Sequence, residues 1–403
     1  MRVSTAPARD LLRRLGDPQR GRPVVLVAGT KGKGSTLAQV EAALLRAGLH
    51  TALFTSPHVE HVTERVRLDG EPVAPARFAP AIDAALDARE AARRDGTEAA
   101  AATWFDVVIG ASAVAASDPA IDVWLVEVGL GGRLDSTNAL DPWVCGVTSI
   151  ELEHTAVLGD TREAIAAEKA GVARSGRVLV HGLGADDPAG RRVEEVARAA
   201  GAIVRGVGAG GGIDQRNGRL ARALLDALGE AFDAVGRSGS RPSGALLDGL
   251  EPPRLPGRLE LFPGPPPVVL DGAHVPEALA LVLGELAGRP GLRGAPDVVF
   301  SCARDKRADE LLKVLAGRAE TLISSSLPEG RSETAGELAE RARRVGLAAE
   351  PEDDPVRALE AAMRRARARG GWVLVTGSLH LLGPPRAHLR HLARCSPSSP
   401  TCS

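Results

Sequence analysis

Short apolar runs alternate with longer helical stretches along most of the chain. In the first half these runs are VVLVA (24–28), TALF (51–54), VWLVEV (123–128) and WVCGVTSI (143–150). They contain few polar residues and are bounded by Gly, Asp or Pro, which is typical of strands buried on both faces of a parallel sheet. A helical stretch from Ser35 to Ala47 follows the first run. Strands that alternate with helices predict a doubly wound α/β sheet.

A segment rich in Gly, Pro and Ser, from Ser238 to Pro267, interrupts this pattern and indicates a domain boundary. The alternation then resumes with PVVLD (267–271), DVVFSC (297–302), TLISSS (321–326) and WVLVT (372–376). We therefore predict a first α/β domain over 1–252, a smaller Rossmann-like α/β domain over 253–394, and a disordered tail over 395–403. The Ala-rich, charged stretch 83–103 is expected to form a solvated helix.

Charge and composition exclude several classes of protein. Lys plus Arg number 50 and Asp plus Glu number 51, so there is no basic field for nucleic acid. No apolar run approaches the roughly 18 residues that cross a bilayer, and the N-terminus lacks the apolar block of a secretory signal. The cysteines show no metal-like pairing. A cytoplasmic protein with neither nucleic acid nor membrane as partner is the simplest interpretation.

A glycine-rich loop follows the first predicted strand and precedes a helix. It consists of Gly29, Thr30, Lys31, Gly32, Lys33, Gly34, Ser35 and Thr36. Glycines allow backbone N–H groups to converge on phosphate oxygens, and the helix N-terminus adds positive potential. Lys33 can reach the terminal phosphates of a nucleotide, while a hydroxyl can cap the helix or approach magnesium. The G-x-x-G-K-x-S spacing differs from the common phosphate-loop pattern.

Glu127 ends an otherwise apolar predicted strand and precedes a glycine-rich segment. A buried carboxylate is costly unless it binds a cation or a hydrogen-bond donor. Ligands of open α/β sheets lie at the carboxyl ends of strands, and magnesium prefers hard oxygen ligands. Glu127 is therefore a candidate metal ligand, although a capping or loop glutamate is the simpler alternative.

Taken together, these motifs resemble the folylpolyglutamate synthase/dihydrofolate synthase family of the Mur ligase superfamily. The loop at 29–35 matches the family's G-T-[NK]-G-K-G-S, and further blocks follow in family order. These blocks are TSPH (55–58), EVGLGGRLDSTN (127–138), EHTAVLG (153–159), EKAGV (168–172), PGRLE (256–260), DGAH (271–274) and TGSL (376–379). The resemblance implies a first domain like the central domain of Mur ligases and a C-terminal glutamate-ligase domain.

The resemblance also implies a metal site and catalytic residues. Ser56, Glu127 and His154 would be the magnesium ligands, and two ions are expected. Lys33, Lys169 and His154 would be catalytic, with Lys169 carbamylated so that it supports the metal site. This chain has Glu153 where the family usually has Asp, and the longer side chain shifts the carboxylate.

Further residues are assigned by the resemblance to ATP and to the other substrates. The expected contacts to ATP, besides the loop residues, are Asn217, Arg258 and Asp271. The expected substrate-binding residues are Phe105, Asp135, Ser136, Thr137, His274 and Ser378. Asp135, Ser136 and Thr137 fall where the family contacts its pterin, whereas His274 and Ser378 fall near its glutamate site. Val275 replaces the usual Asn of the family's D-G-A-H-N-P, so any contact by that side chain is lost.

The implied reaction is ATP-dependent ligation of L-glutamate to a folate, to dihydropteroate, or to both. An acyl phosphate would form first, and ADP and phosphate would be released. The protein is expected to be a monomer. Two alternatives stay open: a Mur-type amide ligase with a non-folate acceptor acid, and a nucleotide-binding module without catalysis. Little sequence precedes Leu15, so either the start codon has been assigned too far downstream or the pterin pocket is altered. Segment 201–214 is also shorter than the corresponding part of the family.

Overall fold

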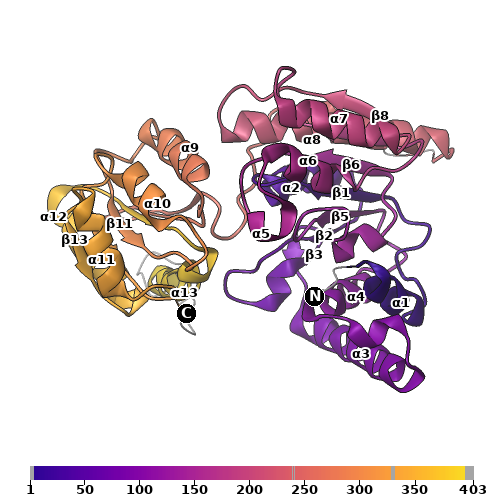
Figure 1. The fold of residues 1–403 in the computed structure, drawn as a ribbon, viewed down its shortest axis with the longest axis horizontal. Coiled ribbons are helices and arrows are strands. Elements are labelled where there is room, and N and C mark those ends of the chain that lie inside the picture. Colours follow the sequence, from indigo (N-terminus) through magenta and orange to yellow (C-terminus); the bar gives the residue numbers. More distant parts are fainter. Residues whose placement is uncertain (1–3, 238, 240, 328–331, 395–403) are drawn as a thin grey trace. The chain divides into compact units, whose positions relative to one another are not determined.

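The computed structural model of the 403-residue chain describes residues 4–237, 239, 241–327 and 332–394. Within it the chain divides into two compact units, Met1–Pro57 with Val62–Pro253, and His58–His61 with Arg254–Ser403 (Figure 1). The sequence-based domain ranges stay a prediction, and they did not assign His58–His61 to the second unit. The predicted disordered tail at 395–403 lies outside the described residues.

The first unit is built on a sheet with the strand order β4-β3-β2-β5-β1-β6-β7-β8. Its strands are β1 (Val24–Ala28), β2 (Thr51–Phe54), β3 (Val66–Leu68), β4 (Glu71–Pro72), β5 (Val123–Glu127), β6 (Val144–Val147), β7 (Val178–His181) and β8 (Ile203–Gly206). Pairing is parallel from β2 to β8, and β3 and β4 add an antiparallel edge. The central strands β1, β2, β5 and β6 are buried along their whole length, as their apolar runs predicted, and β7, which the sequence analysis did not identify, is equally buried.

Helices cover both faces of this sheet. They are α1 (Ala6–Arg14), α2 (Lys33–Arg46), α3 (Pro75–Asp95), α4 (Trp104–Ala115), α5 (Thr155–Leu158), α6 (Arg162–Ala170), α7 (Pro188–Ala199) and α8 (Ile213–Ala234). Val25 and Val27 of β1 pack with α2 and α8 in one core. Val24 and Leu26 point to the opposite face, where α1, α3, α4, α6 and α7 form the other core. Alternate residues of the same apolar strand thus supply both cores.

The expectation of a solvated helix over 83–103 was wrong in its bounds; the helix is exposed along most of its surface, but one face is buried, which the prediction did not include. Helix α3 begins at Pro75 and ends at Asp95, where Gly96 adopts the left-handed conformation typical of a helix end. Ala85 and Ala92 are completely buried, because one face of α3 packs on α4. The small Ala side chains permit this close packing, so a charged composition concealed an amphipathic helix.

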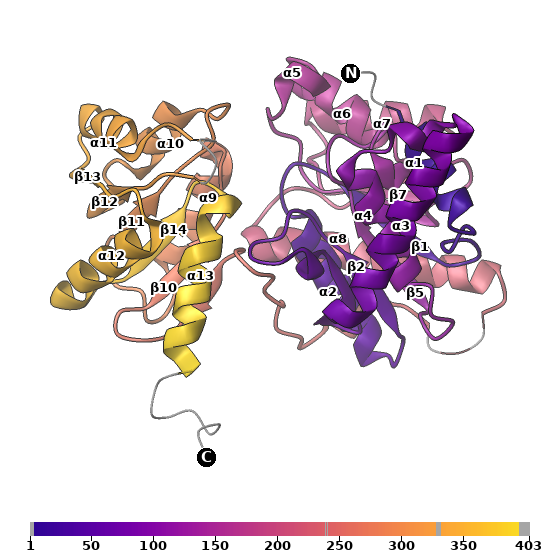
Figure 2. The ribbon, with the colours of Figure 1, turned by 90° about the horizontal axis from the view of Figure 1, so that it is seen from below.

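The second unit contains a smaller sheet with the order β13-β12-β11-β14-β10-β9. Its strands are β9 (Glu260–Phe262), β10 (Val268–Asp271), β11 (Asp297–Phe300), β12 (Thr321–Ser324), β13 (Ala349–Pro351) and β14 (Val373–Thr376). Its helices are α9 (Pro276–Ala287), α10 (Ala308–Leu315), α11 (Ala335–Arg344), α12 (Pro355–Arg369) and α13 (Leu379–Arg394). Helices α12 and α13 pack on one face, and α10 and α11 lie on the other (Figure 2). The α/β fold class with two mainly parallel sheets is therefore confirmed.

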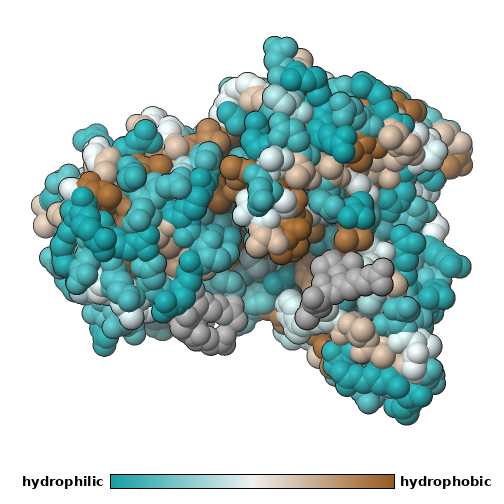
Figure 3. Space-filling model, viewed as in Figure 1, coloured by the Kyte–Doolittle hydropathy of each residue, from teal (hydrophilic) through white to brown (hydrophobic). Residues whose placement is uncertain are grey.

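Among the described residues, nine large hydrophobic side chains are exposed. Figure 3 shows a mainly hydrophilic face, with hydrophobic residues in small, scattered groups on each unit. Among the residues that the structure describes, none of the helices combines the length and the apolar character that crossing a bilayer requires.

Candidate active site

The glycine-rich loop lies at the carboxyl end of β1 and leads directly into α2. Gly29 has a φ of +139°, and a Cβ placed there would lie 1.8 Å from Thr148 Oγ1. Gly32 is left-handed and forms the N-cap of α2, which begins at Lys33. The loop is further held by Thr30, whose N–H donates to Ser149 O at 2.8 Å. The backbone conformation therefore requires glycine at positions 29 and 32. The loop places its backbone N–H groups close to the N-terminus of α2, where an anion can bind.

Replacing Gly29 by alanine should disrupt this loop. The added methyl group would overlap Thr148, and the positive φ is unfavourable for a residue with a side chain. We expect a loss of about 1–3 kcal/mol in the free energy of unfolding and weaker ATP binding, measured by thermal denaturation and calorimetry. Gly184→Ala is the control, because a Cβ at Gly184 meets no atom within 4 Å. Wild-type ATP affinity in Gly29→Ala would contradict this account of the loop.

Three of the predicted site residues meet at the ends of neighbouring strands. β1 and β5 pair so that Val27 lies opposite Glu127. Lys33 Nζ lies 3.9 Å from Glu127 Oε1 and donates to Gly29 O at 2.9 Å. The backbone N–H of Ser56, just beyond β2, donates to Glu127 Oε2 at 3.0 Å. The structure therefore brings Lys33, Ser56 and Glu127 together where the strand order reverses, between β1 and β5.

The chemistry of this cluster suits a hard cation. The carboxylate of Glu127 is 2% exposed and, with the Ser56 hydroxyl, offers oxygen ligands of the kind that magnesium prefers. Thr36 Oγ1 on the first turn of α2 is buried and has no hydrogen-bond partner among the described residues. No group of three or more His, Cys, Asp and Glu side chains in the described part of the chain could hold a metal by itself. Any ion at Glu127 would therefore need hydroxyl or nucleotide oxygens as further ligands.

His154 lies on a loop that contacts the phosphate loop. It is exposed, has a φ of 49° and forms the N-cap of α5. Upstream in the same loop, the N–H of Glu151 donates to Thr30 Oγ1 at 3.1 Å. The segment is thus anchored beside the phosphate loop, and the role of His154 as a metal ligand stays a prediction.

Lys169 forms a buried ion pair next to this loop. Its side chain is 2% exposed, and its Nζ lies 2.9 Å from Glu153 Oε1. Burial lowers the pKa of Lys169, although Glu153 opposes this shift. Burial would raise the pKa of Glu153, but Lys169, Lys33 and Lys31 together lower it to about 2. Lys169 is therefore not a solvated helical lysine. Its charge and the charge of Lys33 both act on Glu153.

Phe105 and Asp135 lie together beside the Gly129 segment. The ring of Phe105 packs edge-to-face on Phe54 with centroids 6.0 Å apart, and its edge is 2.6 Å from a Cβ placed on Gly129. Asp135 is 7% exposed and accepts hydrogen bonds from the N–H groups of Leu130 (2.8 Å) and Thr137 (3.0 Å). Burial raises the pKa of Asp135, against these hydrogen bonds. Its carboxylate shapes this loop, and its contact with a substrate stays a prediction.

Ser136 and Thr137 share the same network. Ser136 Oγ donates to Asp106 Oδ1 at 2.6 Å, and Asp106 in turn closes the capping box of α4 with Thr103. Thr137 is completely buried. These residues join the loop to the start of α4, and their contacts with a substrate stay predictions.

Sequence reasoning missed an aromatic and basic pair beside this loop. Trp104 is 54% exposed, and the guanidinium of Arg65 lies 4.8 Å from its ring centroid. Arg65 is 7% exposed, burial lowers its pKa, and Glu127 opposes that shift. Trp104 precedes Phe105 at the start of α4. Two adjacent aromatic residues in a chain with 2% aromatic residues were the signal that the sequence offered.

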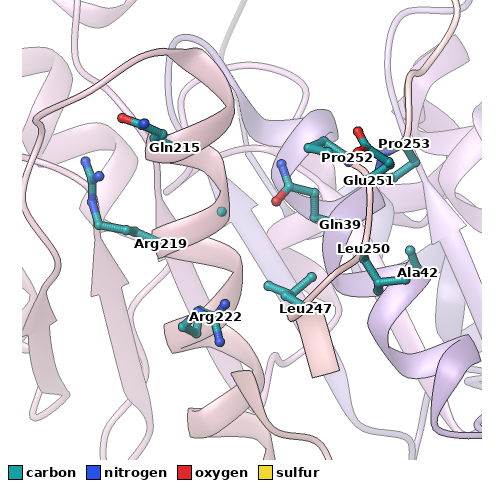
Figure 4. Close-up of a pocket in the computed structure, with 11 residues that line it drawn as sticks. Gln39, Ala42, Gln215, Arg219, Arg222, Leu247, Leu250, Glu251, Pro252 and Pro253 are labelled. Atoms are coloured by element: carbon teal, nitrogen blue, oxygen red, sulfur yellow. The ribbon is translucent and has the colours of Figure 1, made fainter. Parts of the chain in front are cut away.

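Asn217 packs against the phosphate loop. A Cβ on Gly32 would lie 2.4 Å from Asn217 Oδ1. Asn217 Nδ2 is buried and lacks a hydrogen-bond partner among the described residues. Its neighbours Gln215 and Gly218 line a pocket of about 300 Å³ between α2 and α8, beside the segment from Leu247 to Pro253 (Figure 4). No residue of the phosphate loop itself lines this pocket.

The predicted residues of the second unit gather at the carboxyl end of its own sheet. Asp271 ends β10 and accepts hydrogen bonds from the N–H groups of Leu259 and Ala273, each at 2.9 Å. His274 Nδ1 lies 2.8 Å from Gly272 O. Ser378 follows β14, which pairs with β10, and is 6% exposed. Asp271 thus fixes the turn around Arg258, while the contacts of all four residues with substrates stay predictions.

Comparisons with known proteins agree with this arrangement. The family profile described as "Mur ligase, glutamate ligase domain" matches residues 257–379. A dihydrofolate synthase/folylpolyglutamate synthase of Escherichia coli K12 is 32% identical over 382 residues, which cover 91% of this chain and 86% of that protein. A probable bifunctional folylpolyglutamate synthase/dihydropteroate synthase of Haloferax volcanii is 32% identical over 96% of this chain. The chain spans only 48% of that protein's length and 37% of its Halobacterium salinarum counterpart's.

Solved structures resemble the whole chain. The structure described as "E.coli FolC in complex with DHPP and ADP" has a TM-score of 0.83 and 28% identity, and covers 98% of this chain and 95% of that one. A bifunctional folylpolyglutamate synthase/dihydrofolate synthase with Mn, AMPPNP and L-glutamate bound has a TM-score of 0.80 and 29% identity, with 97% and 95% covered.

Proposed function

Because the chain belongs to the folylpolyglutamate synthase/dihydrofolate synthase family, we propose that it is an ATP-dependent ligase joining L-glutamate to a folate or to dihydropteroate. One observation carries the proposal: Lys33, Ser56 and Glu127 converge at the phosphate loop, with 3.9 Å and 3.0 Å contacts to Glu127. A lysine ammonium, a backbone anion site and a buried carboxylate at a strand end are the parts that phosphoryl transfer from ATP requires.

The residues of the chain act on ATP as follows. The acceptor carboxylate attacks the terminal phosphorus, the bond to ADP breaks, and an acyl phosphate forms. Backbone N–H groups at the start of α2 and the ammonium of Lys33 stabilise the charge on the transferring oxygens. The amine of glutamate then attacks the acyl carbon, phosphate leaves, and the amine loses a proton. AMP as a product would exclude this sequence.

A divalent metal fits the first unit, and related structures contain manganese with a nucleotide analogue. Glu127 and Ser56 would hold it, with His154 as a further ligand. When bound, it would supply Lewis-acid charge near the phosphate oxygens. Glu127, Ser56 and His154 do not determine how many ions bind. Two ions are proposed from the family resemblance.

Carbamylation of Lys169 is part of the same proposal. Attack on carbon dioxide requires the neutral amine, and burial lowers the pKa of Lys169 toward that form. The carbamate would place a second negative charge beside Glu153, so it would need a nearby cation. Intact-mass measurement in bicarbonate should show one added carbon dioxide in the native protein and none in Lys169→Arg. An unmodified mass for the active protein would refute this modification.

The nucleoside of ATP is proposed to pass Gly32 and contact Asn217. The unpartnered Nδ2 of Asn217 supports this, because a buried donor is costly unless a ligand accepts its hydrogen bond. A pocket between α2 and α8, lined by Gln215 and Gly218 on either side of Asn217 in the sequence, supplies space nearby. Arg258 and Asp271 are proposed to contact ATP, and His274 and Ser378 to contact glutamate, on the family resemblance alone.

The acceptor acid is proposed to lie against Phe105 and Trp104. Trp104→Ala should raise KM for the acceptor about 3- to 10-fold, because a flat heterocycle loses one stacking surface. KM for ATP should not change, since Trp104 lies outside the phosphate loop. Ile203→Ala is the control, since Ile203 is 52% exposed but lies on the edge strand β8. An unchanged acceptor KM would place the acceptor elsewhere.

The decisive experiment tests substrates directly. Purified protein with Mg²⁺, ATP and L-glutamate should release phosphate only when dihydropteroate or tetrahydrofolate is added, and the acceptor should gain one glutamate by mass. Hydroxylamine should trap the acyl phosphate. Turnover with a different acid alone would favour the non-folate Mur-type ligase. Thermal stabilisation by Mg-ATP without turnover on any acid would favour a binding module without catalysis.

A further inference from the structure

A buried ion cluster in the second unit joins two distant segments of the chain. Arg386 on α13 donates through Nε to both carboxylate oxygens of Glu260, each at 2.9 Å. Its Nη1 donates to Glu60. The side chains of Arg386, Glu60 and Glu260 are 12%, 9% and 18% exposed. A guanidinium presents several donors in a fixed fork, which suits simultaneous binding of two carboxylates.

The Glu260 arm leads to the turn that carries Arg258. Glu260 Oε2 accepts the N–H of Gly257 at 2.8 Å. Gly257 is left-handed, with a φ of +65°, and its carbonyl accepts the N–H of Gly272 at 3.0 Å. The turn is therefore held by Glu260 on one side and by β10 on the other. The conformation of this turn determines the position of the Arg258 backbone and therefore the direction in which its side chain leaves the turn.

The Glu60 arm leads to the segment that follows Ser56. By its contacts, His58–His61 is part of the second unit, whereas the preceding residues Ser56 and Pro57 are part of the first. Val59 packs against the apolar core that contains Leu382 and Leu389 of α13. Its carbonyl oxygen approaches Gly383 so closely that a Cβ there would lie 2.8 Å away. The segment is thus fixed on α13 by packing as well as by charge.

We infer that Arg386 is a positioning residue for the ligase reaction: one guanidinium holds both the segment that follows Ser56 and the turn that carries Arg258. This inference rests on the proposed function, in which Ser56 and Arg258 act on metal and ATP. Glu60 is four residues after Ser56, and Glu260 is two residues after Arg258. Loss of the guanidinium would release both segments at once, without removing any group that touches substrate.

Amide hydrogen exchange of the full-length protein tests the positioning without reference to activity. Arg386→Gln should speed exchange in peptides covering 56–62 and 255–261. Glu60→Gln should do so only in the first, because the Glu260 arm remains. The control is Arg364→Gln, which removes an exposed arginine of α12 and should leave exchange in both peptides unchanged. Unchanged exchange of both peptides in Arg386→Gln would overturn the inference. Glu60→Gln serves as the test if Arg386→Gln does not fold.

Kinetics test the consequence. Arg386→Gln should lower kcat/KM for ATP by about 10- to 100-fold, as misplacement of a binding group does. The loss should be smaller in an Arg258→Ala background, because Arg386 would then position only the segment that follows Ser56. Arg386→Lys should recover part of the rate, since an ammonium can still bind one carboxylate. Equal losses in both backgrounds would overturn the inference. If the wild-type protein transfers no glutamate, the proposed function fails, while the exchange experiment still decides on the positioning.

Discussion

Replacing Lys33 by methionine should lower the rate of ATP-dependent glutamate transfer by about 100- to 1000-fold. Methionine approximates the length of the side chain but removes its charge. In the structure the ammonium donates to Gly29 O at 2.9 Å and lies 3.9 Å from Glu127 Oε1, so it is already held at the phosphate loop. A cation fixed before ATP binds stabilises the developing charge without reorganisation during the reaction.

The rate would be measured as phosphate release that depends on both glutamate and the acceptor acid. Lys313→Met, on the exposed side of α10, is the matched control for loss of one lysine charge and should leave the rate unchanged. Thermal denaturation would show whether the loop still folds, because Lys33 also supports two loop carbonyls. A folded Lys33→Met protein with wild-type turnover would remove Lys33 from the mechanism.

The second large effect is on stability. In protein prepared without bicarbonate, in which Lys169 is not carbamylated, Lys169→Met should reduce the free energy of unfolding at neutral pH by about 3–5 kcal/mol, because it leaves the carboxylate of Glu153 buried without its ion-pair partner. The contact that is lost is 2.9 Å long, between side chains that are 2% and 8% exposed. Chemical denaturation at equilibrium is the measurement. Double replacement with Glu153→Gln should restore part of the loss, since no unpaired charge would remain.

The pH dependence of this effect has a definite sign. In the native protein the pKa of Glu153 is lowered to about 2, chiefly by Lys169 against the effect of burial. Its ionised form therefore stabilises the fold above the unfolded pKa of the carboxyl, and this contribution is lost only as the pH falls toward about 2. In Lys169→Met, only Lys33 and Lys31 would still oppose the effect of burial, so the pKa of Glu153 would be higher than in the unsubstituted protein and protonation would remove part of the destabilisation. The difference in stability should thus be smaller at about pH 5 than at about pH 8. An equal difference at both values would contradict the ion pair.

Much of the fold could be predicted from local pattern. The strand from Val24 to Ala28 was identified to the residue, because five apolar residues bounded by Pro and Gly can only be buried. Edge strands such as β3 and β4 were missed, since they are short and their burial is partial. Helix α3 was given the wrong bounds and its buried face was missed, because Ala is compatible with both solvent and a close helix contact.

The sequence by itself determined the phosphate loop, the α/β architecture and the residue types at the strand ends, because these depend on local glycine geometry and on hydrophobic periodicity. Only the tertiary structure decided which distant groups meet. It paired Glu127 with Lys33 and Ser56 through strand order, and it gave the buried Lys169 a partner in Glu153. It also placed His58–His61 on α13, where Arg386 holds Glu60 and Glu260. Such contacts join positions tens to hundreds of residues apart, and no periodicity along the chain records them.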